Sequence, residues 1–237
     1  APPTTRCVQT AVSHHRSISG ITISFLRPGG RHRCASRLSL HHLFVARVSS
    51  SIDAELSDKW RRGPGIFVVI DARGPAGERI HAIQHAYDPK LANYLPPHLT
   101  LAGSSGVGPI DPKTSRERLR EVLGEIAAST APMTLAFKAP IRFMQSDIIV
   151  LPLDHHGPLR DLYERIATCG LAFQPARFSF TPHVTLSFFR TLTPLQRREL
   201  LAVRLEEPLV VDHIRCSLTD EPLPPRALFE LPLTGDR

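Results

Sequence analysis

The sequence contains one five-residue pattern twice, and this repeat constrains the fold more than any other feature. The pattern is Pro-His-apolar-Thr-Leu, found at residues 97–101 (PHLTL) and again at residues 182–186 (PHVTL). In an extended strand, residues i and i+2 share one face. If both copies lie on strands, each presents a histidine and a threonine on one face and two aliphatic residues on the other.

A single His-x-Thr carries little information here, because a chain with 12 histidines contains one about once by chance. Two copies of the longer pattern, with histidines 85 positions apart (183 minus 98), are not expected by chance. One explanation is structural: each histidine is half-buried and hydrogen-bonded to its neighbouring threonine. The other is chemical. Two imidazoles at one site suit metal-free phosphoryl chemistry, one accepting a proton and one donating it, while the threonine hydroxyls bind phosphate oxygens.

The segments around the two copies predict a mixture of helices and strands. An apolar run at 65–72 predicts a buried strand, and a helix at 77–87 should end before Asp88-Pro89. The clearest helix follows, with Asp111 as its expected N-cap and Pro112 in its first turn. The other expected elements are strands at 98–103, 134–143, 147–153, 176–189, 209–220 and 227–233, and helices at 157–170 and 193–203. The pattern predicts an α+β fold, largely antiparallel, with helices covering the sheets.

The net positive charge of the chain is concentrated near its N-terminus. Residues 1–50 contain seven arginines, no lysine and no acidic residue. Removing these seven from the 29 basic residues leaves 22, equal to the 22 acidic residues, so the net charge of +7 belongs to this segment. The rest of the chain is near neutral and does not predict a broad basic surface for nucleic acid.

We interpret residues 1–62 as a basic, disordered leader and residues 64–237 as one domain. The leader is rich in Arg and Ser and poor in acids, as organelle transit peptides are. A vector-derived segment and translated sequence upstream of the true start remain alternatives. We expect the domain itself to be cytoplasmic and monomeric.

The sequence does not indicate a zinc protein, a disulfide-rich protein or a membrane protein. The four cysteines are scattered without a Cys-x-x-Cys, which indicates neither a zinc site nor a disulfide framework. The most apolar part of the leader, residues 21–26, is far shorter than the roughly 20 residues that span a bilayer. We therefore expect no structural metal, no membrane span and no cofactor.

The two motifs resemble those of a known family. The paired His-x-Thr strands, the preceding segment YDPKLANYLPPHLTL (87–101) and the spacing of 85 positions look like the two-histidine (2H) phosphoesterases. This group includes the 2′-5′ RNA ligase-like proteins and the RNA 2′,3′-cyclic phosphodiesterases. The resemblance extends from about residue 64 to the end of the chain and excludes the leader.

The resemblance implies a bilobal fold in which two antiparallel sheets face a central cleft and each supplies one motif. It implies that His98 and His183 are the catalytic pair and that Thr100 and Thr185 contact phosphate. The implied reaction is metal-independent hydrolysis of a 2′,3′-cyclic phosphate on a small nucleotide or RNA end, or chemistry at a 2′-5′ linkage. It does not indicate which histidine is the base.

Other residues are weaker candidates. His81 and His85 have the i, i+4 spacing of a metal-binding helix but lack a following glutamate and a third ligand, so an ordinary helix face is the better interpretation. His155 and His156 precede a helix, where loop or capping roles fit best. Further candidates are arginines that could bind phosphate and aromatic residues that could stack on a base: Arg142, Arg177, Arg190, Phe143, Phe178, Phe180, Phe188 and Phe189.

Two functions from other classes stay open at this point. A nucleotide-binding module on the same fold would keep both motifs without turnover. A protein-interaction domain would use the two histidines only structurally.

Overall fold

The computed structural model describes residues 63–143, 146–220 and 223–236. The expected leader, with its disorder and its targeting role, lies outside the described residues. The α+β prediction is confirmed, because the described part combines helices with antiparallel strands.

Seven strands form one hydrogen-bonded sheet in the order β4-β5-β6-β2-β1-β8-β9, and all of their pairings are antiparallel. In that order the strands are β4 (Ile141–Arg142), β5 (Ile149–Pro152), β6 (His183–Ser187), β2 (His98–Ala102), β1 (Gly65–Asp71), β8 (His213–Thr219) and β9 (Arg226–Pro232). A separate two-stranded sheet pairs β3 (Met133–Leu135) with β7 (Leu209–Val211). Each motif therefore lies on a strand, as predicted.

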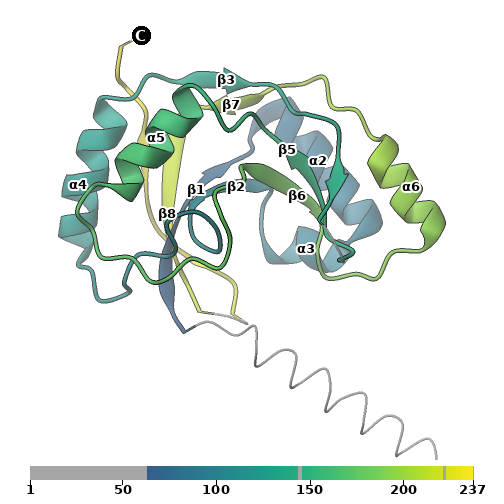
Figure 1. The fold of residues 1–237 in the computed structure, drawn as a ribbon, viewed down its shortest axis with the longest axis horizontal. Coiled ribbons are helices and arrows are strands. Elements are labelled where there is room, and N and C mark those ends of the chain that lie inside the picture. The colour runs from purple at the N-terminus through teal and green to yellow at the C-terminus, as the bar shows by residue number, and fades with distance from the viewer. Residues whose placement is uncertain (1–62, 144–145, 221–222, 237) are drawn as a thin grey trace, which may run out of the picture. The chain divides into compact units, whose positions relative to one another are not determined.

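The two motif strands lie side by side at the middle of this order (Figure 1). Each is paired over four residues with its outer neighbour, β2 with β1 and β6 with β5. Between β2 and β6 the register contains one pair, Leu99 opposite Val184. The two sheets expected from the sequence are thus the two halves of the order, β9-β8-β1-β2 and β6-β5-β4, joined at a single position.

The described residues form five helices, two of which pack against the half of the sheet that does not contain the motif strand they precede. They are α2 (Gly74–Tyr87), α3 (Pro89–Tyr94), α4 (Arg116–Ala128), α5 (Pro158–Ala167) and α6 (Pro194–Ala202). Helix α2, which precedes the first motif, packs against β6 of the second, while α5, which precedes the second motif, packs against β2 of the first. In Figure 1, α4 and α5 lie at the left of the motif strands and α6 at the right. Each motif strand is therefore covered by a helix from the other half.

Burial along the motif strands follows the predicted alternation. Leu99, Leu101, Val184 and Leu186 are all 0 % exposed, whereas the histidine and threonine of each motif are half-buried. Burying such an aliphatic side chain contributes about 1.5–3 kcal/mol. A register slip of one residue would exchange the two faces, so this burial also fixes which face carries the polar residues.

Several predicted elements differ in their bounds from the structure, among them the strand expected at 209–220, which is divided into β7 and β8 in different sheets. Helix α4 begins after Ser115, whose Oγ accepts the Arg118 N–H (3.2 Å), because Asp111 instead closes a turn by accepting the Lys113 N–H (2.9 Å). The single strand expected at 134–143 is divided into β3 and β4, which pair with different partners. Asp88 ends α2 as predicted, but it also caps a further helix, α3, through the Leu91 N–H (3.2 Å).

Candidate active site

The four motif side chains lie on one face of β2 and β6. Directly opposite residues of an antiparallel pair point to the same side, and the next residues along point to the other. Continuing the Leu99–Val184 register by one residue in either direction places His98 across from Thr185 and Thr100 across from His183. All four residues that the sequence singled out therefore lie on adjacent strands and on the same face of them.

The two imidazoles are held in the same way. His98 Nδ1 is 2.8 Å from the carbonyl oxygen of Pro96, and His183 Nδ1 is 2.6 Å from that of Thr181. A carbonyl only accepts hydrogen bonds, so each Nδ1 carries the proton and donates it. This tautomer leaves each Nε2 with a free lone pair for chemistry. The threonine-bonded arrangement that the purely structural explanation requires is therefore not the one found.

Both imidazoles favour the neutral form. Burial lowers the pKa of His98 below its usual 6.5; the Pro96 carbonyl and Asp71 act against this, and the Arg215 guanidinium adds to it. Burial also lowers the pKa of His183, and charge on His98 lowers it further.

A buried ion pair lies beside His98. Asp71, opposite His98 in the β1–β2 register, binds Arg215 of β8 through two hydrogen bonds, from Nε (2.7 Å) and Nη2 (2.6 Å). Arg215 also donates from Nη1 to the Ser217 hydroxyl. Burial alone would raise the pKa of Asp71, but His213 and Arg215 together hold it far below its usual value. The carboxylate is thus ionised at any physiological pH.

The second motif has no such charge at the equivalent places. Pro152 is opposite His183 where Asp71 is opposite His98. Val150 is opposite Thr185, and Ile141 of β4 is opposite Val150 in turn. The two motif strands are therefore paired with their outer neighbours in equivalent ways. The charged residues beside His98, however, correspond to uncharged residues beside His183.

His213 is buried (5 % exposed) between two carboxylates. Its Nδ1 is 2.5 Å from Asp212 Oδ1 and its Nε2 is 3.9 Å from Asp71 Oδ2. Asp71 raises the pKa of His213 above 6.5, Asp212 adds to this, and burial opposes it. The folded state therefore retains a proton on His213 at pH values where the unfolded chain has lost it.

This proton gives a testable pH dependence of stability. Because the folded pKa of His213 is raised, its contribution is fully present below pH 6.5 and is lost as pH rises through the folded pKa. We expect the free energy of unfolding, measured in urea, to decrease from pH 6.5 to pH 9. His213→Asn should remove most of this slope. A variant that keeps the wild-type slope would assign the pH dependence to another group.

Of the aromatic candidates, one contacts a motif histidine. The Phe143 ring lies edge-on to His183, with centroids 5.0 Å apart. Phe180 instead stacks on Tyr163 at 3.8 Å, while Phe188 and Phe189 contact each other at 4.9 Å. Phe143 is thus the aromatic candidate that lies beside the second motif.

The three arginine candidates lie in different segments of the described part of the chain. Arg142 pairs with Asp147 (3.4 Å) at the end of β4. Arg177 and Arg190 are exposed, in the segments before and after β6. A role of any of the three in binding phosphate stays a prediction.

The histidine pairs outside the motifs lie on the surface. His81 and His85 are exposed on α2, and the described residues supply no third metal ligand beside them. His155 and His156 lie in the loop before α5, as predicted, but the expected capping role was wrong. The N-cap is Gly157, whose φ of 67° is left-handed and which makes no side-chain cap.

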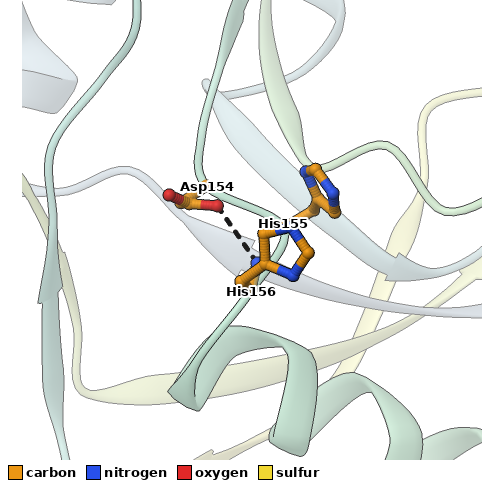
Figure 2. Close-up of side chains that lie close together, drawn as sticks. All are labelled: Asp154, His155 and His156. Carbon is orange, nitrogen blue, oxygen red and sulfur yellow. Dashed lines mark hydrogen bonds between the residues drawn. The ribbon is translucent and has the colours of Figure 1, made fainter.

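That loop contains the one group, within the described ranges, that offers three potential metal ligands: Asp154, His155 and His156 (Figure 2). Their ligand atoms lie within 4.8 Å of one another, and Asp154 Oδ1 accepts the His156 backbone N–H (3.2 Å). All three are exposed, and the Lys138 ammonium is 3.7 Å from Asp154 Oδ2, where it competes with a cation. The group has no buried ligand and so lacks the features of a built metal site.

Sequence reasoning missed the charged residues beside the first motif. Asp71 was included in the first strand only as the end of an apolar run, and Arg215 and His213 lie more than 140 positions away from it (215 minus 71 is 144). A carboxylate ending a buried strand was the available signal. Its partners depend on the β1–β8 register, which no local pattern specifies.

Comparison with known proteins gives one family and several similar structures. The family model described as "2'-5' RNA ligase superfamily" matches residues 73–221. LigT of E. coli in its apo form is 19 % identical, with a TM-score of 0.48 over 73 % of this chain and 99 % of that one. TT0787 of Thermus thermophilus is 18 % identical, with a TM-score of 0.43 over 73 % and 100 %. No curated protein sequence matches the chain.

Within the described part of the chain, no helix has both the length and the apolar character needed to cross a membrane.

Proposed function

The chain belongs to the 2′-5′ RNA ligase superfamily of 2H phosphoesterases, and from this premise we propose that it hydrolyses 2′,3′-cyclic phosphates on RNA ends or small nucleotides, or acts at 2′-5′ linkages, without a metal ion. One observation carries the proposal. The strand pairing at Leu99–Val184, continued by one residue in each direction, supports a shared face for His98, Thr100, His183 and Thr185, and each imidazole donates its Nδ1 proton to a backbone carbonyl.

The proposed hydrolysis needs one proton acceptor and one proton donor. One neutral imidazole takes a proton from water as the water oxygen attacks phosphorus. The bond from phosphorus to the 2′ or 3′ oxygen breaks, and the other imidazole, protonated, gives its proton to that oxygen. The hydroxyls of Thr100 and Thr185 donate to the non-bridging oxygens, where negative charge increases in the transition state. The products are a phosphomonoester and a free hydroxyl.

The pH profile follows from the burial of the two histidines. One imidazole must be neutral and the other protonated, so kcat/KM should be bell-shaped. Because burial lowers the pKa of both His98 and His183 in the free enzyme, both limbs move to the acid side. We expect the maximum of kcat/KM below pH 6.5, measured on a cyclic nucleotide. A profile that is flat from pH 5 to pH 9 would contradict paired acid and base roles.

Phosphorus NMR of the protein with nucleoside 2′,3′-cyclic monophosphates tests the reaction, since conversion to a monoester moves the phosphorus signal. The main alternative is a binding module on the same fold. It predicts that a nucleotide raises the unfolding temperature, by an amount that grows with its concentration, while no product forms. An interaction protein would show neither effect.

A further inference from the structure

A buried glutamine of α2 holds the backbone of the second motif. Gln84 is 2 % exposed, and its Nε2 donates to the carbonyl oxygen of Thr185 at 2.7 Å. This bond joins a helix of the first half to β6 of the second, 101 positions away. The rest of the buried face of α2 is small or apolar: Ala76, Gly77, Ile80 and Ile83.

A glutamine at this buried position lowers the stability of the fold. Its Oε1 is buried and has no hydrogen-bond partner among the described residues. A buried polar atom without a partner costs stability, and a leucine of similar size would avoid that cost. Packing therefore does not explain the glutamine, whereas its bond to Thr185 does.

Asp88, four residues further on, acts on the same strand. It is 1 % exposed, and its Oδ2 accepts the backbone N–H groups of Phe188 (2.7 Å) and Phe189 (2.8 Å), which directly follow β6. One end of α2 thus binds β6 in its middle, through Gln84, and at its exit, through Asp88.

These contacts matter because the two motif strands share so little else. β2 and β6 are joined by the single pair Leu99–Val184. Gln84 and Asp88 therefore add polar attachments to a strand that is otherwise joined to β2 at one position.

We propose that Gln84 and Asp88 are positioning residues, which set the place of His183 and Thr185 relative to His98 and Thr100. The inference rests on the proposed function, because it concerns the same four side chains. It adds two residues outside both motifs, Gln84 in α2 and Asp88 at the C-cap of α2, that the reaction requires for geometry and not for proton transfer.

Gln84→Leu tests this directly. The variant removes the bond to Thr185 and keeps the volume, so we expect kcat on a cyclic nucleotide to fall about 10- to 100-fold with an almost unchanged unfolding midpoint. The matched control is Gln174→Leu, because Gln174 also donates to a backbone carbonyl, that of Pro64 (2.9 Å), but in another part of the domain. Wild-type kcat in Gln84→Leu would overturn the proposal.

Gln84→Glu separates positioning from packing. The protonated carboxyl can donate to the Thr185 carbonyl and the ionised carboxylate cannot, while burial raises the pKa of such a group. We expect the ratio of variant to wild-type kcat to be near one at low pH and to fall as the glutamate ionises. A ratio independent of pH would count against the proposed role of the bond.

A third readout does not depend on turnover. NMR titration of the two imidazoles should show that Gln84→Leu changes the titration of His183 and leaves that of His98 nearly unaltered. If neither changes, the positioning role is wrong. If wild type has no activity but the His183 titration shifts as expected, the proposed function fails and the attachment of β6 through α2 stands.

Discussion

Replacing either His98 or His183 with alanine is expected to lower kcat/KM for a 2′,3′-cyclic nucleotide by about 10²- to 10⁴-fold, the range of a lost general acid or base. Each imidazole is half-buried and makes one hydrogen bond, to the carbonyl of Pro96 or Thr181. Losing that bond costs only about 0.5–1.5 kcal/mol of stability. Activity should therefore fall far more than the unfolding midpoint.

His85→Ala is the matched control, because His85 is exposed on α2 and lies outside both motifs. It should retain wild-type activity. Full activity in both motif variants would show that His98 and His183 are not the catalytic pair. A large loss of stability with little loss of activity would instead support the structural explanation of the repeat.

The second large effect is expected at the buried ion pair beside the first motif. Asp71→Ala leaves the Arg215 guanidinium without its two acceptor oxygens in a place where both side chains are only about 10 % exposed. Removing one partner of a buried pair typically costs about 3–5 kcal/mol, because the remaining charge stays buried without compensation. Urea unfolding at pH 7 measures this loss.

The double variant Asp71→Leu/Arg215→Met shows whether the loss comes from the uncompensated charge. Replacing both partners by apolar side chains removes both charges of the pair, while His213 keeps Asp212 as its partner, so the double variant should be more stable than Asp71→Ala. It should also be more stable than the sum of the two single variants predicts. Additive losses would show that Asp71 and Arg215 stabilise the fold through separate contacts.

Much of the fold was predictable because the relevant signals are local. The alternation of polar and aliphatic residues in HLTL and HVTL predicted which faces of the two strands are buried, and the four aliphatic residues are fully buried. Thr193 and Gln196 form the capping box that starts α6 at the expected place. Proline in the first turn marked α5 in the same way.

The errors arose where two local signals compete. Asp111 and Ser115 are both good N-caps, and only the turn that Asp111 closes shows that Ser115 starts the helix. Proline after Asp88 predicted the end of a helix, and it marks the start of the next one as well. Neither choice is visible without the backbone path.

Residues that support the motifs could not be predicted, because their contacts depend on register and helix placement. Arg215 reaches Asp71 only through the β1–β8 pairing. Gln84 reaches Thr185 only because α2 crosses to the other half. A glutamine on a helix is ordinary by sequence, and its significance appears only from its burial and its partner.

The most direct test of the account is incubation of the protein, in EDTA, with an RNA that ends in a 2′,3′-cyclic phosphate, with the 2′- and 3′-phosphate products resolved. We predict metal-independent opening of the ring to a single isomer, which identifies the oxygen that leaves, and loss of this activity in His98→Ala and His183→Ala. An intact cyclic end in EDTA, opened only when a metal ion is added, would contradict it.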